Sequence, residues 1–178
     1  KLDAVISKTR PDIVLVQGDT TTAYMAALTS FYLKIDVAHV EAGLRTYDIY
    51  SPFPEEINRQ SISAIAKLHF APTTLAAQNL VKEGRDNIHV TGNTVVDALV
   101  DILDRDSSPA MLGLEKLVSE SCDTNKCKLL LLTAHRRENL GEPLKQIFAA
   151  ISSLLTARKD VVVVYPIHLN PQVKVAAE

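Results

Sequence analysis

Short runs of apolar residues alternate along this chain with longer segments in which apolar residues recur every three or four positions. The short runs predict buried strands, and the longer segments predict helices that pack through one face. The expected strands span residues 12–17, 36–40, 68–71, 87–91, 128–133 and 160–165. The expected helices span residues 20–33, 55–66, 73–83, 93–103 and 142–157. This alternation is typical of an α/β fold with parallel sheets and helices on both faces.

The pattern is interrupted after Gly92, where a strand ends and a long helix leads into the polar residues 104–126. The only further element expected in that stretch is a short helix near 114–120. We therefore predict two α/β domains, residues 1–92 and 93–178. Because the chain begins without a methionine and stops early in a helical pattern, we expect the start of the first domain and the end of the second to be missing.

The composition favours a folded protein and excludes several classes of partner. Hydrophobic residues make up 47% of the 178 residues and charged residues 22%, which is enough for a packed core. The formal net charge is −2 and the basic residues are dispersed, so no surface for nucleic acid or anionic membrane is indicated. No apolar run approaches the roughly 18 residues of a membrane span. The two cysteines, Cys122 and Cys127, predict neither a disulfide framework nor a zinc site, and we expect a reducing, cytoplasmic compartment.

Chemically reactive side chains directly follow several of the predicted strands. Ligands of open parallel sheets bind beyond the carboxyl ends of the strands, so these residues are the candidates for a site. Asp19 and Glu41 follow two strands, and a third is followed by His135, Arg136 and Arg137. Carboxylates in one cleft suit acid–base catalysis because repulsion and burial raise their pKa values, whereas Arg and His suit a diphosphate. The pattern predicts one cleft that joins proton transfer to anion binding, without a metal.

Some of the acidic residues also fit purely structural roles. Asp19 is well placed as the N-cap of the helix at 20–33. Glu55 and Glu56 lie in the first turn of the next helix, where negative charge is favourable in any case. Taken alone, each is therefore interpreted as structural rather than catalytic. That helix follows the long loop 46–54, and loops of this length inside a compact domain are often functional.

The basic residues leave similar alternatives. Arg45 and Arg59 fit ordinary salt bridges with these acids as well as ligand binding. His39, His69 and His89 lie inside predicted strands and are interpreted as structural histidines. The sequence contains no Gly-x-Gly-x-x-Gly motif and no Walker loop, so neither NAD nor ATP is indicated as a cofactor.

Five segments, most of them at strand ends, carry distinctive motifs. They are Gln17-Gly-Asp-Thr-Thr-Thr22, His39-Val-Glu-Ala-Gly-Leu-Arg45, Phe53-Pro-Glu-Glu-Ile-Asn-Arg59, Val90-Thr-Gly-Asn-Thr-Val-Val-Asp97 and Thr133-Ala-His-Arg-Arg-Glu-Asn139. Taken together and in this order, these motifs resemble those of the non-hydrolysing UDP-N-acetylglucosamine 2-epimerases. The resemblance extends from about residue 11 to about residue 171. Any one motif alone would be weak, but five in order are specific.

The resemblance implies a glycosyltransferase-B-type fold, in which two Rossmann-like domains with parallel sheets face a deep cleft, and of which this chain would hold a part of each domain. It implies reversible C2 epimerisation of UDP-N-acetylglucosamine (UDP-GlcNAc) to UDP-N-acetylmannosamine (UDP-ManNAc) without an external cofactor. The expected route eliminates UDP to a 2-acetamidoglucal and adds it back. The resemblance further implies a cytoplasmic homodimer that supplies polysaccharide biosynthesis.

The resemblance also implies roles for individual residues. The catalytic acids fall on Asp19, Glu41 and Glu55, and His135 matches the histidine that faces the UDP portion. The residues predicted to bind substrate are Arg45, Arg59, Arg136, Arg137 and Asn139. In bacterial members UDP-GlcNAc is also an allosteric activator, and the matching positions are Glu55, Arg136 and His168.

The chain departs from the family pattern at both ends. The family's N-terminal phosphate-binding loop, of the Gly-Thr-Arg-Pro-Glu kind, is absent, as is the C-terminal segment that binds uracil, ribose and diphosphate. We therefore hypothesise that these 178 residues alone are inactive. Three other functions stay open: a hydrolysing epimerase that releases free ManNAc and UDP, a glycosyltransferase of the same fold, and a non-catalytic nucleotide-sugar sensor.

Overall fold

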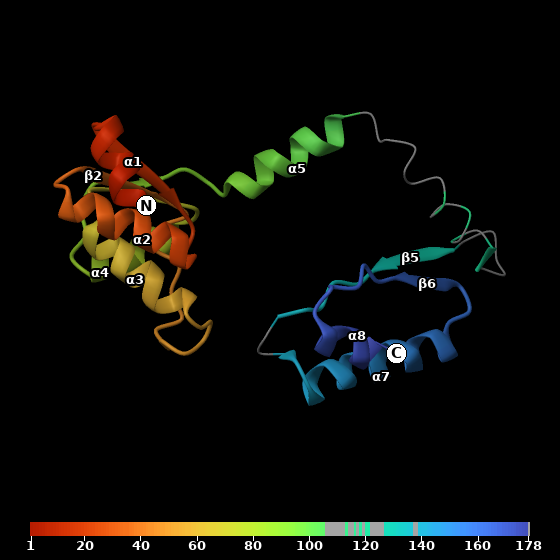
Figure 1. Cartoon of the computed structure of the whole chain (residues 1–178). Helices are drawn as coiled ribbons and strands as arrows, with labels where there is room; N and C mark the ends of the chain where they lie inside the picture. The colour runs from red at the N-terminus through yellow and green to blue at the C-terminus, as the bar shows by residue number, and fades with distance from the viewer. Residues whose placement is uncertain are drawn as a thin grey trace. The chain divides into compact units, whose positions relative to one another are not determined.

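The computed structural model describes residues 1–105, 113, 116, 118, 120–121, 127–136 and 139–177. The chain divides into two compact units, Lys1–Arg105 and Asp106–Glu178 (Figure 1). The short helix expected near 114–120 falls mostly outside the described residues, and Cys122 and Arg137 fall outside them entirely.

Four parallel strands form the sheet of the first unit, in the order β1-β2-β3-β4. Their bounds are β1 Ile13–Gln17, β2 Asp36–Val40, β3 Leu68–Ala71 and β4 Ile88–Val90. Gln17 pairs with Val40, and Val40 pairs with Phe70, so the carboxyl ends of β1, β2 and β3 lie side by side. The turns that carry Asp19 and Glu41 therefore leave the sheet from neighbouring positions.

Helices connect these strands, as the alternating pattern predicts. Their bounds are α1 Leu2–Thr9, α2 Thr21–Tyr32, α3 Glu55–Ile65 and α4 Thr74–Lys82. The prediction that Asp19 caps α2 is wrong. The helix begins one residue later than that role requires, so Thr20 is the N-cap and its hydroxyl accepts a hydrogen bond from Ala23 N at 3.2 Å. The Asp19 carboxylate pairs with Arg59 of α3 instead.

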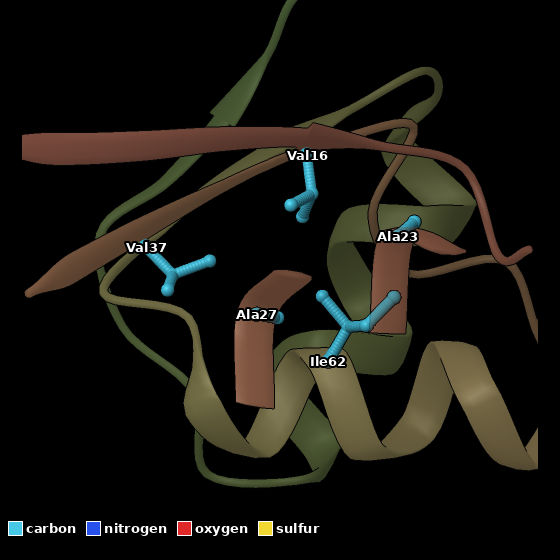
Figure 2. Close-up of a cluster of buried hydrophobic side chains, with 5 residues drawn as sticks. All are labelled: Val16, Ala23, Ala27, Val37 and Ile62. Carbon is cyan, nitrogen blue, oxygen red and sulfur yellow. The ribbon is translucent and has the colours of Figure 1, made fainter. Parts of the chain in front are cut away.

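Small and branched apolar side chains from β1, α2, β2 and α3 form the main core of the first unit. Figure 2 shows this cluster, which consists of Val16, Ala23, Ala27, Val37 and Ile62. Two alanines in α2 leave room for Ile62 of α3, which is fully buried. On the opposite face of β1, Ile13 and Leu15 are 41% and 64% exposed. At β1, the helices expected on both faces are therefore found on one face only.

The two units separate after α5 (Thr94–Asp104), the helix that follows the last strand of the first unit. The Gln17 side-chain amide donates a hydrogen bond to the Thr94 hydroxyl at 3.3 Å, so the start of α5 is attached to the end of β1. The sequence pattern places the boundary before this helix rather than after it. The division into domains 1–92 and 93–178 stays a prediction.

The second unit contains two parallel strands, β5 (Lys128–Leu131) and β6 (Val161–Val164). Its described helices are α7 (Glu142–Ala157) and α8 (Pro171–Ala177), and Leu144 of α7 is fully buried. In the described parts of the chain, no helix is long and apolar enough to cross a membrane. The predicted α/β architecture with parallel sheets is confirmed in both units.

Candidate functional site

The turn after β1 is tied to β2 by two hydrogen bonds. Gly18 has φ of +68°, a conformation that glycine adopts without strain. Its N–H donates to Val40 O at 3.0 Å, and its carbonyl oxygen lies 2.9 Å from His39 Nε2. The His39 ring is fully buried, so this second bond is shielded from water. The position of Asp19, the next residue, is thus set by contacts with the neighbouring strand.

Glu41 directly follows β2 and has a left-handed backbone conformation, with φ of +67°. This conformation is uncommon for a residue other than glycine, and such strain often accompanies a functional site. A Cβ atom at Gly18 would lie only 3.6 Å from Glu41 Oε2, so the Glu41 carboxylate lies beside the turn that carries Asp19. The next residue, Ala42, donates its N–H to Phe70 O at 3.0 Å and fixes the turn to β3.

Two consecutive residues of α3 hold Asp19. Asn58 Nδ2 donates to the backbone oxygen of Asp19 at 2.9 Å, and Arg59 Nη2 lies 3.0 Å from its carboxylate. Burial raises the pKa of Asp19 above its ordinary value, the Arg59 charge acts against this rise, and the Glu55 charge adds to it. A carboxylate with a raised pKa is a suitable acid or base near neutral pH.

The two adjacent glutamates of α3 differ in how far their side chains are buried. The Glu56 carboxylate is fully buried and accepts hydrogen bonds from Thr46 N at 3.1 Å, Tyr47 N at 3.0 Å and Gln60 Nε2 at 2.8 Å. Burial alone would raise the pKa of Glu56, but the hydrogen bonds from Gln60 and the two backbone N–H groups outweigh it and lower the pKa. Glu55 is half-buried and makes none of these contacts. Of the two, only Glu55 is available to a ligand.

Two of the four arginines predicted to bind substrate, Arg45 and Arg59, lie in the first unit, and both are engaged there. The Arg45 side chain is fully buried; it forms two hydrogen bonds with the Glu83 carboxylate, at 2.7 and 2.8 Å, and donates to the Ser63 hydroxyl at 2.9 Å. These are the contacts of a structural residue. Arg59 is 11% exposed and lies between Asp19 and Glu56. A direct role of either arginine in substrate binding stays a prediction.

In the second unit, His135 and His168 lie together. Their rings stack with centroids 4.8 Å apart and an interplanar angle of 23°. His168 Nδ1 accepts a hydrogen bond from Asn170 N at 3.1 Å, which orients its ring. Tyr165 at the end of β6 donates its hydroxyl to Ala134 O at 2.7 Å and so fixes the residue before His135.

The remaining predicted residues of this unit are close to His135 in the chain. His135 and Arg136 are exposed, and Asn139 donates its N–H to Arg136 O at 3.0 Å. Arg137 lies outside the described residues. The structure thus gathers Asp19, Glu41 and Glu55 in the first unit, and His135, Arg136, Asn139 and His168 in the second.

The supporting roles of three residues were not predicted from the sequence, although Glu56 was named there and His39 was interpreted as structural. Asn58 and Glu56 hold the turn at Asp19 and the loop 46–54, and His39 holds the turn at Gly18. Asn58 and Glu56 belong to the same motif as Glu55, but a motif does not reveal which of its side chains point inward. For His39 the signal was its position one residue before the end of β2, next to the turn of the neighbouring strand.

A family model described as UDP-N-acetylglucosamine 2-epimerase matches residues 1–178. The chain belongs to this family. A curated UDP-N-acetylglucosamine 2-epimerase of Bacillus subtilis (strain 168) is 53% identical over 180 residues, which cover 99% of this chain and 45% of that protein. The chain therefore spans about half the length of the curated relatives that it matches.

Solved structures of this family share the fold of the chain. A UDP-GlcNAc 2-epimerase from Neisseria meningitidis bound to UDP-GlcNAc is 43% identical, with a TM-score of 0.86 over 99% of this chain and 48% of that chain. An S. aureus protein in a co-structure with UDP is 45% identical, with a TM-score of 0.87 over 99% of this chain and 46% of that chain. The predicted glycosyltransferase-B-type fold is confirmed by this likeness.

Proposed function

We propose that the protein to which this chain belongs converts UDP-GlcNAc reversibly into UDP-ManNAc by inverting C2 of the sugar. The observation that carries the proposal is the gathering of three carboxylates, those of Asp19, Glu41 and Glu55, beyond the carboxyl ends of β1 and β2. The solved relative from N. meningitidis, with UDP-GlcNAc bound, supports the choice of substrate class.

The chemistry of the substrate explains why several acids are needed. No carbonyl group neighbours C2 in the ring, so direct removal of its proton is too difficult. If the C1–O bond breaks first, UDP leaves with the bonding electron pair and C1 gains oxocarbenium character, which acidifies the C2 proton. A carboxylate then takes that proton, and the C–H electron pair forms the C1–C2 double bond of 2-acetamidoglucal. Protonation of C2 on the other face and return of UDP to C1 give the epimer.

The residues of the chain supply the two kinds of group that this route requires. Asp19, Glu41 and Glu55 provide proton-transfer groups, and the raised pKa of Asp19 suits a group that must both take and return a proton. His135, with Arg136 and Arg137, would balance the negative charge of departing UDP, and Asn139 would help to bind it. No step of this route needs an external cofactor.

The remaining predictions are part of this proposal. They are a cytoplasmic homodimer, a role in polysaccharide biosynthesis, and a second, allosteric UDP-GlcNAc bound by Glu55, Arg136 and His168. The stacked rings of His135 and His168 favour the last of these, since a ligand at His168 would touch the ring that faces UDP. The hydrolysing epimerase is the alternative, because it would use the same acids and differ only in the fate of the intermediate.

The experiment that tests the proposal is incubation of UDP-GlcNAc with the full-length protein in D2O. Deuterium at C2 of both UDP-GlcNAc and UDP-ManNAc, with the UDP linkage retained, is the expected result. Release of free ManNAc and UDP would instead identify the hydrolysing enzyme. Transfer of the sugar to an acceptor would identify a glycosyltransferase. Binding of UDP-GlcNAc without deuterium exchange would instead indicate a non-catalytic nucleotide-sugar sensor.

A further inference from the structure

We propose that Glu56 is a positioning residue of the site: through Arg59 it orients the Asp19 carboxylate, and through two backbone N–H groups it holds the loop 46–54, without touching the substrate. This inference rests on the proposed epimerase reaction. It assigns different tasks to the adjacent glutamates of α3, since Glu55 is partly exposed and Glu56 is fully buried.

The contacts of Glu56 with the loop are the first support. Both carboxylate oxygens are engaged, Oε2 by Thr46 N at 3.1 Å and Oε1 by Tyr47 N at 3.0 Å. Gln60 also donates to Oε1, at 2.8 Å, and the side chain is inaccessible to solvent. Hydrogen bonds to a buried charge are strong and directional, and a buried carboxylate with these partners holds its position. The start of the loop is thus fixed to the first turn of α3.

The position of Arg59 is the second support. Its guanidinium lies between two carboxylates: Nη2 is 3.0 Å from Asp19 Oδ2, and Nε is 3.5 Å from Glu56 Oε2. Glu56 and Arg59 are one helical turn apart, so both ends of this contact are carried by the same rigid element. The Glu56 charge therefore attracts the Nε side of the guanidinium while Nη2 meets Asp19, through an ion pair without hydrogen-bond geometry.

The charges of the three groups give the inference a measurable signature. Arg59 lowers the pKa of Asp19, whereas the negative charge of Glu56 raises it. Removing the charge of Glu56 leaves Arg59, among the described residues, with Asp19 as its carboxylate partner. The pKa of Asp19 then falls, and the acidic limb of the profile of kcat/KM against pH, which reports groups of the free enzyme, moves to lower pH.

The test uses the full-length enzyme with the substitution E56Q. We expect kcat to fall by about tenfold to a hundredfold, because a small displacement of a catalytic group is enough for such a loss. KM should change by less than about threefold, because Glu56 does not contact the substrate. The acidic limb of kcat/KM should move to lower pH. Wild-type kcat together with an unmoved acidic limb would overturn the inference.

Two further variants separate positioning from a general loss of stability. E83Q is the matched control, because Glu83 also pairs with a buried arginine of the first unit, Arg45, but has no contact with the acids. E83Q should lower thermal stability and leave the acidic limb of kcat/KM at the same pH. A shift of that limb in E83Q as large as the shift in E56Q would overturn the inference. E56D keeps the negative charge but shortens the side chain. Its kcat should therefore fall, while the acidic limb of kcat/KM against pH should stay at the same pH. If E56Q does not fold, E56D becomes the test: a kcat of E56D equal to that of the unmodified enzyme would overturn the inference.

The failure of this inference is distinguishable from failure of the proposed function. An unmodified enzyme that exchanges no deuterium at C2 contradicts the proposed function. An unmodified enzyme that is active, with an E56Q variant of equal kcat and equal pH profile, contradicts only the role of Glu56.

Discussion

His39, a single buried histidine of β2, makes the stability of the fold depend on pH. Burial lowers its pKa to about 4 from the ordinary 6.5, against the hydrogen bond with Gly18 O, which acts in the opposite direction. The unfolded chain binds a proton at His39 below pH 6.5, but the folded chain does so only below about pH 4. This contribution to stability is therefore complete above pH 6.5 and falls, by about 3 kcal/mol in all, as the pH decreases to about 4.

We expect the substitution H39Q to remove that part of the pH dependence, because glutamine does not titrate and can still donate to Gly18 O. Urea unfolding at about pH 7 and about pH 4.5 measures the difference, which should be smaller in H39Q than in the unmodified protein by about 2 kcal/mol. H89Q is the control, since His89 lies exposed on β4. Equal acid sensitivity of H39Q and the unmodified protein would refute this account of His39.

Asp19 provides a second prediction at the level of the residue. In the full-length enzyme we expect D19N to reduce kcat by about a hundredfold to ten-thousandfold, because an amide cannot exchange the proton that a carboxylate carries. D36N is the control, because Asp36 begins β2, at the edge of the sheet away from the acids, and its described ion pair is with exposed Lys67. Deuterium incorporation at C2 is the measurement, and a D19N variant with normal exchange would remove Asp19 from the catalytic set.

At this scale the sequence predicts where the acids lie but not what surrounds them. Asp19 and Glu41 were identified because each directly follows an apolar run, and the end of such a run is visible in the sequence. The assignment of Glu55 rather than Glu56 depended on the family resemblance, since both occupy the first turn of one helix. Only the path of the loop 46–54, which brings two N–H groups to Glu56, shows which carboxylate is buried.

At the scale of the elements, the turn after β2 depends on Gly43. A Cβ atom at this position would lie 2.2 Å from Ala76 O of α4, and the backbone φ of +88° already disfavours any other residue. We therefore expect G43A to destabilise the first unit by more than about 3 kcal/mol, because strain in the turn and overlap with α4 add together. Thermal or urea unfolding of the chain measures this loss.

Gly84 offers a matched control for Gly43. Its φ of +72° is similar, but no atom lies within 4 Å of the position of a Cβ. G84A should therefore lose only the conformational part, about 1 kcal/mol. Similar losses for the two variants would mean that contact between the turn and α4 does not limit the position of Glu41.

The elements were predicted best where their hydrophobic pattern is strong. The bounds of β2, β3 and α7 agree with those expected, because each is a run or periodic segment with clear flanking residues. Asn93 caps α5 as expected, with its side chain accepting from Val95 N at 3.1 Å. The helix α1 was missed because it has only eight residues and buries only Ile6, so it offers few core positions from which to recognise it.

At the scale of the whole molecule, the chain carries about half of a family member. The acids lie in the first unit and His135 in the second, so the proposed reaction needs both units together with the parts of the relatives that this chain does not match. We expect the purified 178-residue chain to show no C2 exchange under conditions in which the full-length protein exchanges. Circular dichroism must first establish that the chain is folded; clear turnover by the folded chain would refute the expectation.

The fold of the whole molecule was accessible to sequence reasoning because strand–helix alternation restricts the topology, and five motifs in order restrict it further. The division at residue 92 stays a prediction. A turn such as the one at Gly92 looks the same in sequence whether the next helix stays with its sheet or leaves it; in the structure, Gln17 donates a hydrogen bond to Thr94 at the start of that helix.

The way in which Glu56 holds the loop 46–54 has a consequence for how this family can change. Glu56 binds the loop through main-chain N–H groups, which every residue except proline provides. The side chains of Tyr47, Ile49 and Tyr50 are exposed and do not take part in that attachment. Ile49 is therefore open to variation that leaves the acids in place, whereas Tyr47, with a backbone φ of +62°, tolerates mainly glycine, asparagine or aspartate beside its present residue.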